Sequence, residues 1–341
     1  MLRSRAGAAA LLLCALAARA TAAPPPPVRA YVTGATGASG ELLILDGPAP
    51  PAGVLAHASY DAAINRTGWS FFSVTANASE PNATLASYAA GLLEGYLTWR
   101  ELAGFAANTG ALEPNAKRLQ DFLDKNYAWM TEQVRLHASQ DAYWAQLGGV
   151  LAQLQGEVAG QARAGGRLTF YSLYQGLLLG GDMFNLEPLY GASPQQRART
   201  PRLAAARSGR ADHCSALVRL APGAKDILVA HTTWSGFENL GRSLKRYDLP
   251  LPVNGGTPSP GSVVLLSGYP GLLQYSSDDL YVNAPSGLVT LETTIDNNNA
   301  SLAQQYASHK VVLEWLRNVL ANRLATDGAS WAEVFSRYAS G

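Results

Sequence analysis

The stretch "DHCSALVRLAPGAKDILVAHTTW", residues 212–234, has the pattern of a β-hairpin. Two runs rich in branched apolar residues, 214–220 and 226–234, flank a short polar connection. That connection carries Pro222 and Gly223 in the order that β-turns favour. The stretch therefore predicts two antiparallel strands, and the residues at their open end become neighbours.

A cysteine lies at that open end. Pairing about the turn sets Cys214 opposite Thr232 or Thr233. His231 and Trp234 lie one step to either side. A single cysteine is often a small apolar core residue, so the hairpin alone leaves two interpretations open, packing and reactivity.

The beginning of the chain predicts entry into the secretory pathway. Residues 1–22 have the organisation of a signal peptide: Arg3 and Arg5 form a positive segment, residues 8–17 are apolar, and residues 20–22 are small enough for cleavage. No later stretch approaches ~18 continuous apolar residues, so we expect no transmembrane segment and a soluble lumenal or extracellular protein.

Removal of the signal peptide would leave one cysteine. Cys14 lies within that peptide, so Cys214 is the only cysteine expected in the mature chain. An odd cysteine in a secreted protein indicates intermolecular pairing or a reactive thiol. A homodimer linked through Cys214 is therefore one interpretation.

The remaining composition indicates a globular glycoprotein. Four N-x-[ST] sequons follow the signal peptide, which predicts glycosylation. A formal net charge of +1 with 15% charged residues excludes the basic surface that nucleic-acid binding requires. The four sequon asparagines are Asn65, Asn77, Asn82 and Asn299.

Strand patterns and helical patterns occupy separate parts of the chain, which predicts an α+β fold. Strand patterns before residue 80 give way to a helical block over residues 87–162, and β patterns return after the hairpin begins. Apolar spacing predicts further helices over residues 238–249 and 309–325, and a last one from Ser330, whose capping box is completed by Glu333. The resulting division is a signal peptide (1–22), N-terminal strands with the helical block (23–190), an Arg-rich linker or processing segment (191–213) and a segment that begins with the cysteine (214–341).

Chain cleavage would turn the cysteine into a nucleophile with its own base. Attack of the Cys214 thiol on the carbonyl of His213 gives a thioester, which water hydrolyses. Cys214 then carries a free α-amine with an ordinary pKa of about 7.7–8.0. Such an amine can take the proton of the thiol on the same residue.

Several long motifs carry a resemblance to a known family. The motifs are "YAAGLLEGYLTW" (88–99), "DHCSALVRLAPGAKDILVAHTTW" (212–234), "LSGYPGLLQYSSDDLYV" (266–282), "SGLVTLETTI" (286–295) and "VLEWLRNVLANRLATDGASWAEVFSRYASG" (312–341). In these motifs the sequence resembles the phospholipase B-like family, over essentially the whole mature chain and most densely from Cys214 onward.

The resemblance implies an N-terminal-nucleophile hydrolase with an αββα sandwich of antiparallel sheets between helix layers, autocleaved between His213 and Cys214. Cys214 would be the nucleophile, and His231 and Trp234 would line its pocket. Thr294 would also reach the site. The resemblance places Asp278 or Asp279 near the pocket, and it implies a structural role for Glu94.

The same resemblance implies what the protein acts on. The substrate would be a phospholipid or another acyl ester or amide, with no cofactor and no metal, in the lysosome lumen or outside the cell. Two departures from the family stand out. His213 occupies a position where relatives carry a small residue, and relatives continue beyond Gly341, so we expect a sandwich that is incomplete at its C-terminus. A non-catalytic glycoprotein that binds lipid or a partner is the alternative.

Overall fold

The structure is a computed structural model. It describes residues 26–37, 41–47, 50–77, 82–110, 112, 115–178, 180–191, 214–253, 256–271, 273, 280–293 and 299–339. The predicted signal peptide lies outside the described residues, as does all of the predicted linker except its first residue, Gly191.

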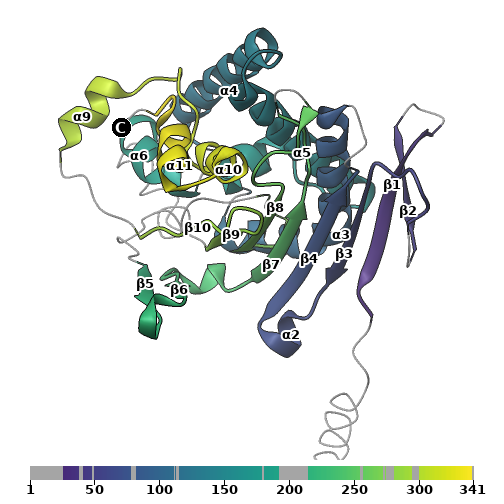
Figure 1. Cartoon of the computed structure of the whole chain (residues 1–341). Coiled ribbons are helices and arrows are strands. Elements are labelled where there is room, and N and C mark those ends of the chain that lie inside the picture. Colours follow the sequence, from purple (N-terminus) through teal and green to yellow (C-terminus); the bar gives the residue numbers. More distant parts are fainter. Residues whose placement is uncertain are drawn as a thin grey trace, which may run out of the picture.

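A large mixed sheet forms the centre of the fold (Figure 1). Its strands follow the order β10-β9-β8-β7-β4-β3-β1-β2, and every neighbouring pair is antiparallel except β4–β7. The sheet thus joins strands from the two halves of the chain and bears out a mixed α and β architecture. The strands are β1 (Val28–Thr36), β2 (Leu42–Asp46), β3 (Ala56–Asp61), β4 (Trp69–Ala76), β7 (Arg242–Asp248), β8 (Val263–Gly268), β9 (Tyr281–Asn283) and β10 (Val289–Thr290).

Three long helices confirm the predicted helical block. They are α3 (Ala83–Thr109), α4 (Lys117–His137) and α5 (Ala142–Arg163). Local chemistry fixes their ends: the side chain of Asn82 accepts a hydrogen bond from the Leu85 backbone N–H at the start of α3. Gly110 ends that helix in the left-handed conformation.

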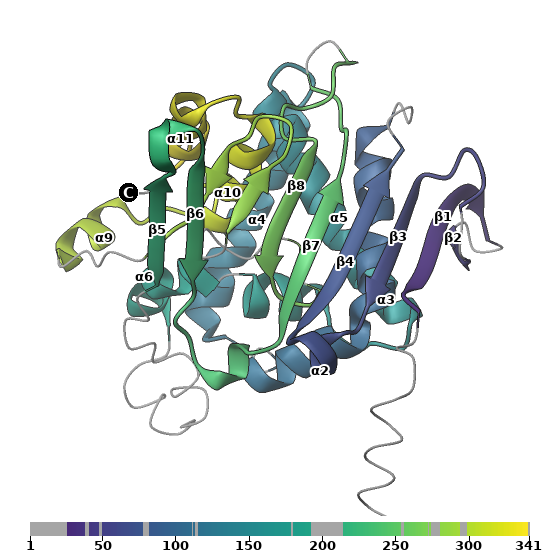
Figure 2. The same ribbon diagram turned by 60° about the horizontal axis from the view of Figure 1, so that its bottom comes forward.

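The sheet has one covered face and one open face. Buried residues alternate with less buried ones along β3, β4, β7 and β8, as the two-residue period of a strand requires. The covered face packs on α3, where Ala86, Ala89 and Leu93 are buried against the strands. Figure 2 views the opposite, open face, with the helices behind it.

Glycines bring α3 and α5 into backbone contact. A Cβ atom at Gly91 or Gly95 of α3 would overlap a carbonyl oxygen of α5. Reciprocally, a Cβ at Gly156 or Gly160 of α5 would overlap a carbonyl oxygen of α3. Only residues without a side chain permit this approach, so the two helices form one tightly packed unit beneath the sheet.

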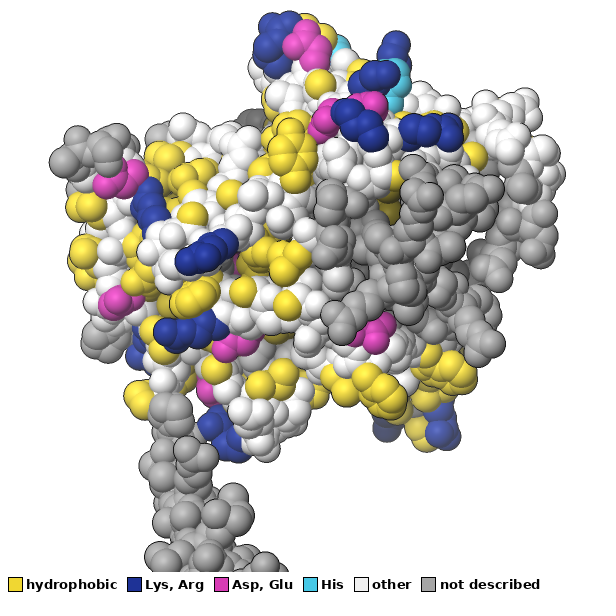
Figure 3. Space-filling view, turned by 180° about the vertical axis from the view of Figure 1, so that it is seen from behind, with side chains coloured by type: hydrophobic (Ala, Val, Ile, Leu, Met, Phe, Trp, Pro, Cys, Tyr) yellow, Lys and Arg dark blue, Asp and Glu magenta, His cyan; other side chains and the backbone are white. Residues whose placement is uncertain are grey.

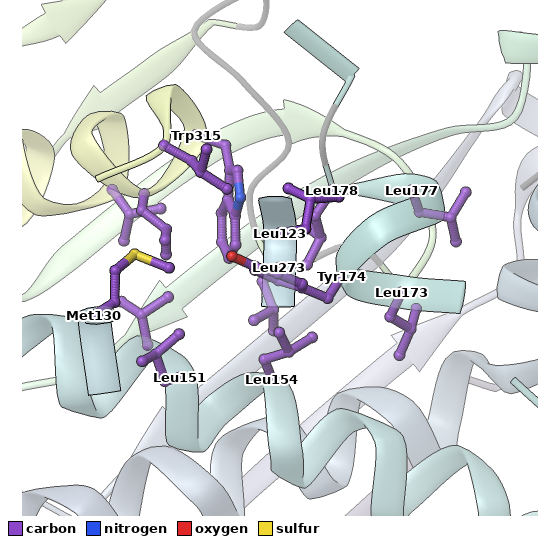
Figure 4. Close-up of a cluster of buried hydrophobic side chains, with 14 of the residues drawn as sticks. Leu123, Met130, Leu151, Leu154, Leu173, Tyr174, Leu177, Leu178, Leu273 and Trp315 are labelled. Carbon is purple, nitrogen blue, oxygen red and sulfur yellow. The ribbon is translucent and has the colours of Figure 1, made fainter. Parts of the chain in front are cut away.

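A second core of buried side chains is built from α4, α5 and helices later in the chain (Figure 4). There Trp315 packs among leucines and Met130, all buried. The carboxylate of Asp182 accepts a hydrogen bond from the Glu314 backbone N–H at 2.8 Å, at the beginning of the helix that carries Trp315. The elements of this region are a π-helix (Ser172–Leu177), α6 (Gly180–Tyr190), α9 (Ala300–Tyr306), α10 (Glu314–Leu324) and α11 (Gly328–Ser336). Elsewhere, a short α2 (Ile64–Thr67) connects β3 to β4.

The helix predicted over residues 238–249 is wrong. Residues 242–248 form strand β7, preceded by a short 3-10 turn (Phe237–Asn239). The buried positions of β7 include Lys245, which a helix prediction treats as solvent-facing. Its Nζ donates to Glu94 on α3 at 2.6 Å. An ion pair therefore stands at an inward position of β7 where a strand normally carries an apolar residue, and this hides the two-residue period of the strand.

Smaller departures concern helix ends and short elements. The capping box of α11 is formed by Asp327 with Ser330, so the predicted box of Ser330 with Glu333 is wrong. Neither α9 nor β3 was predicted from the sequence. The helix predicted from residue 309 begins at Glu314.

The hairpin predicted from residues 212–234 is confirmed as a sheet of its own, with strands β5 (Ser215–Leu220) and β6 (Ile227–Thr232). Its turn is a short 3-10 segment (Pro222–Ala224) with Gly223 at φ 73°. Every residue of β5 is exposed.

The glycine contacts give a first prediction. Gly160→Ala should destabilise the protein by about 1–3 kcal/mol, because the new methyl group meets the rigid backbone of α3. Gly104→Ala is the matched control: this α3 glycine is exposed with open space around it, so alanine should stabilise by about 0.5–1 kcal/mol. Urea unfolding of the two variants measures both effects, and an unchanged midpoint for Gly160→Ala would contradict the close packing.

Candidate active site

Cys214 lies at the start of the hairpin, directly before β5, and is half-buried. The register pairs Ser215 with Thr232 and Ala216 with His231. Continued by one residue, this register sets Cys214 opposite Thr233, one of the two predicted alternatives. The hairpin thus brings the thiol-bearing residue and the histidine to one end of the ribbon.

A third segment joins this end of the hairpin. The Thr293 hydroxyl donates a hydrogen bond to the carbonyl oxygen of Cys214 at 2.9 Å. His231 Nε2 lies 2.7 Å from the carbonyl oxygen of Glu292. Both strands of the hairpin are therefore tied to the same dipeptide, which follows β10 at the end of the large sheet.

The contact with Glu292 fixes the proton on His231. A carbonyl oxygen only accepts hydrogen bonds, so Nε2 must carry the hydrogen. In the neutral ring the lone pair is then on Nδ1, and this nitrogen is the one that can accept a proton. Nδ1 is therefore the ring nitrogen of His231 that is left for chemistry.

Of the other predicted active-site residues, the structure describes only Trp234. Trp234 follows β6 and its side chain is 56% exposed. His213, Thr294 and the pair Asp278 and Asp279 lie outside the described residues. Sequence reasoning named Thr294 but missed Thr293 and Glu292; the signal that pointed to them was the surrounding "LETTI" motif.

Exposed apolar side chains lie along the hairpin and the segment that follows it. Seen from behind, hydrophobic side chains gather over the hairpin at the lower right of Figure 3. The hairpin continues into Phe237, whose side chain is 89% exposed. The patch consists of Leu217, Val218, Leu220, Ile227, Leu228, Trp234, Phe237 and Leu240.

The open face of the large sheet also carries apolar surface. A hollow of about 520 Å³ crosses β3, β4, β7, β8 and β9. Phe71, Leu244 and Leu265 line it, and each is 40% exposed. Exposed apolar surface of this extent marks an interaction site in a soluble protein.

The predicted glycosylation sites lie in different settings. Asn65 and Asn82 are exposed, Asn299 is exposed before α9, and Asn77 is half-buried at the end of β4. The Oδ1 atoms of Asn82 and Asn299 accept local hydrogen bonds. A glycan is attached through Nδ2, so these hydrogen bonds are compatible with modification.

The described part of the chain lacks two kinds of feature. No three His, Cys, Asp or Glu side chains gather there in a way that could hold a metal ion. Among the same residues, no helix combines the length and apolar character that a membrane crossing requires.

Comparison with known proteins decides the family. The sequence profile of the phospholipase B family matches residues 56–341. This chain belongs to the phospholipase B family. The match includes both strands of the hairpin, the segment of Glu292 and Thr293, and most of the large sheet.

Individual relatives agree with this membership. Proteins of Mus musculus and Homo sapiens called "Putative phospholipase B-like 2" are 38% and 37% identical, each over 89% of this chain. Phospholipase B-like protein E of Dictyostelium discoideum is 32% identical over 85% of the chain. The chain spans about half the length of these relatives, 51%, 52% and 53% respectively.

The contacts of the hairpin give a second prediction. Thr293→Val removes the hydroxyl that holds Cys214 and should cost about 1 kcal/mol. Local opening of β5 would then become about fivefold more frequent. Hydrogen exchange of the amides of Ser215–Leu220 measures this opening.

Thr232→Val is the control for that measurement. It makes the same chemical change at an exposed position of the hairpin. Equal exchange rates in both variants would contradict a holding role for Thr293.

Proposed function

We propose that this protein is a hydrolase whose nucleophile is the Cys214 thiol, released for catalysis by cleavage of the bond between His213 and Cys214. The observation that carries the proposal is the position of Cys214 at the start of a strand, beside His231. The family membership and the Arg-rich segment 191–213, a processing segment in this account, support it.

Cleavage would proceed in two steps. The Cys214 sulfur attacks the carbonyl carbon of His213, the C–N bond breaks, and the nitrogen leaves with a proton as an amine. Water then hydrolyses the resulting thioester, which leaves a carboxylate on His213 and a free thiol and α-amine on Cys214. The segment 214–341 thereby becomes the nucleophile-bearing fragment.

Catalysis would repeat the same chemistry on an acyl substrate. The α-amine, with an ordinary pKa of about 7.7–8.0, takes the thiol proton, and the sulfur attacks the acyl carbonyl. The leaving group takes up the proton, and water releases the acyl thioester as a carboxylic acid. His231 Nδ1 would relay protons and Trp234 would shape the pocket, with Thr294 and Asp278 or Asp279 completing it.

Phospholipid is the proposed substrate class. Another acyl ester or an amide is the alternative substrate for the same reaction. The names of the relatives suggest the phospholipid. Trp234 and Phe237, which are exposed and follow the strand of His231, favour a substrate with acyl chains. The predicted signal peptide and sequons support action as a glycoprotein in the lysosome lumen or outside the cell.

The fold proposed for the active protein is the αββα sandwich of N-terminal-nucleophile hydrolases. A two-stranded ribbon is only marginally stable alone. The hairpin would therefore begin a second sheet that covers the apolar hollow on the open face of the first. Both apolar surfaces would then become buried.

A second candidate is a non-catalytic glycoprotein that binds lipid or a partner, including a homodimer linked through Cys214. The exposed hairpin patch favours it, because such surface binds apolar ligands without chemistry.

Fatty-acid release from phosphatidylcholine vesicles tests the proposal. The unmodified protein and Ser215→Ala should release fatty acid, whereas Cys214→Ala should lose at least 100-fold of the rate, because the nucleophile is gone while the neighbouring hydroxyl is not needed. Equal release by all three proteins would contradict the role of Cys214. Vesicle binding without release by any of them would favour the non-catalytic candidate.

A further inference from the structure

A carboxylic acid lies unpaired in the centre of the molecule. Glu157 of α5 is completely buried, and neither of its carboxylate oxygens has a hydrogen-bond partner among the described residues. It lies between Gly156 and Gly160, where the backbones of α5 and α3 touch. The glycines of the two helices thus allow the close contact that excludes water from Glu157.

The nearby cation is already engaged elsewhere. Lys245 Nζ donates to Glu94 at 2.6 Å, and the Tyr247 hydroxyl lies 2.7 Å and 2.9 Å from the two oxygens of the same carboxylate. Glu94 is therefore compensated as an anion. Arg323 of α10 is also buried, and its guanidinium donates to Gln153 at 2.9 Å.

These surroundings favour the neutral form of Glu157. Burial, and next the negative charge of Glu94, raise the pKa of Glu157 well above its ordinary value of 4.5, while Lys245 acts in the opposite direction. Because the pKa is higher in the folded chain, the folded chain keeps a proton that the unfolded chain gives up.

The sign of the effect on stability follows directly. At a pH well below 4.5 both states hold the proton, and Glu157 adds no pH dependence to the free energy of unfolding. As the pH rises above that value the unfolded state ionises first, so the free energy of unfolding decreases until the folded pKa is reached.

We propose that Glu157 is a built-in acid sensor: it is a neutral carboxylic acid in the folded protein, and its ionisation opposes the close packing of α3 on α5, so that this one group makes the fold less stable as the pH rises. Glu157 belongs to α5, whereas the described residues of the candidate active site lie on or beside the hairpin and directly after β10. The proposal therefore goes beyond the proposed function and holds whether or not Cys214 is a nucleophile.

Urea unfolding from about pH 5 to about pH 7 tests the sensor in the full chain. Glu157→Gln keeps the shape of the side chain and is neutral at every pH. The unfolding equilibrium constant of the unmodified protein should rise relative to that of the variant, by up to tenfold per pH unit, because one proton is linked to unfolding. A ratio that stays constant across this range overturns the proposal.

Two controls separate Glu157 from other acids. Glu132→Gln removes an exposed carboxylate, paired with Arg135, and should keep the pH dependence of the unmodified protein. Burial also raises the pKa of Asp182 to about 6, but Asp182 is present in every protein compared and cancels in the ratio.

A second substitution tests the same proposal in case Glu157→Gln does not fold. Glu157→Met keeps the length of the side chain without a polar group, and it should show the same loss of pH dependence. If neither variant folds at about pH 5, a neutral side chain does not replace Glu157 and the proposal is equally overturned.

Discussion

The contact between α3 and α5 at their glycines is the constraint on which the rest of the structure depends. Carbonyl oxygens of each helix occupy the space where side chains of the other would otherwise stand. This closeness makes the two helices a single layer, and the covered face of the large sheet packs on it. It also removes water from Glu94 and Glu157, whose charges must then be compensated or suppressed.

The candidate active site has a different physical character from this core. Its residues belong to a two-stranded ribbon that is exposed on both faces and is tied to the end of the large sheet through Glu292 and Thr293. The rigid layer carries the sheet, and the sheet carries the dipeptide that holds the hairpin. The position of Cys214 is thus fixed relative to the core by two hydrogen bonds, one between Thr293 and Cys214 and one between His231 and Glu292.

The sequence predicted those parts of the fold whose pattern is local. Apolar residues at three- and four-residue spacing identify α3, α4 and α5, and the Pro222–Gly223 turn identifies the hairpin. Strand β7 was mistaken for a helix because Lys245 occupies an inward position, and only the partner Glu94 on a distant helix makes that acceptable.

For the candidate site too, the sequence predicted the local part, which is the hairpin. The hairpin register, read from the turn, brings His231 near Cys214. Thr293 could not be found in this way, because it lies 79 positions from Cys214 and meets it only through the folded sheet. The unpaired state of Glu157 was equally hidden, since it depends on how closely two helices approach.

The identity of the residue at the amino terminus of the nucleophile-bearing chain tests the central claim most directly. Peptide mapping of the mature protein by mass spectrometry reads it without any assumption about substrate. The expected result is a peptide that begins Cys-Ser-Ala-Leu at Cys214 with an unmodified α-amine. Mature protein in which every peptide runs unbroken through His213 and Cys214 would contradict it.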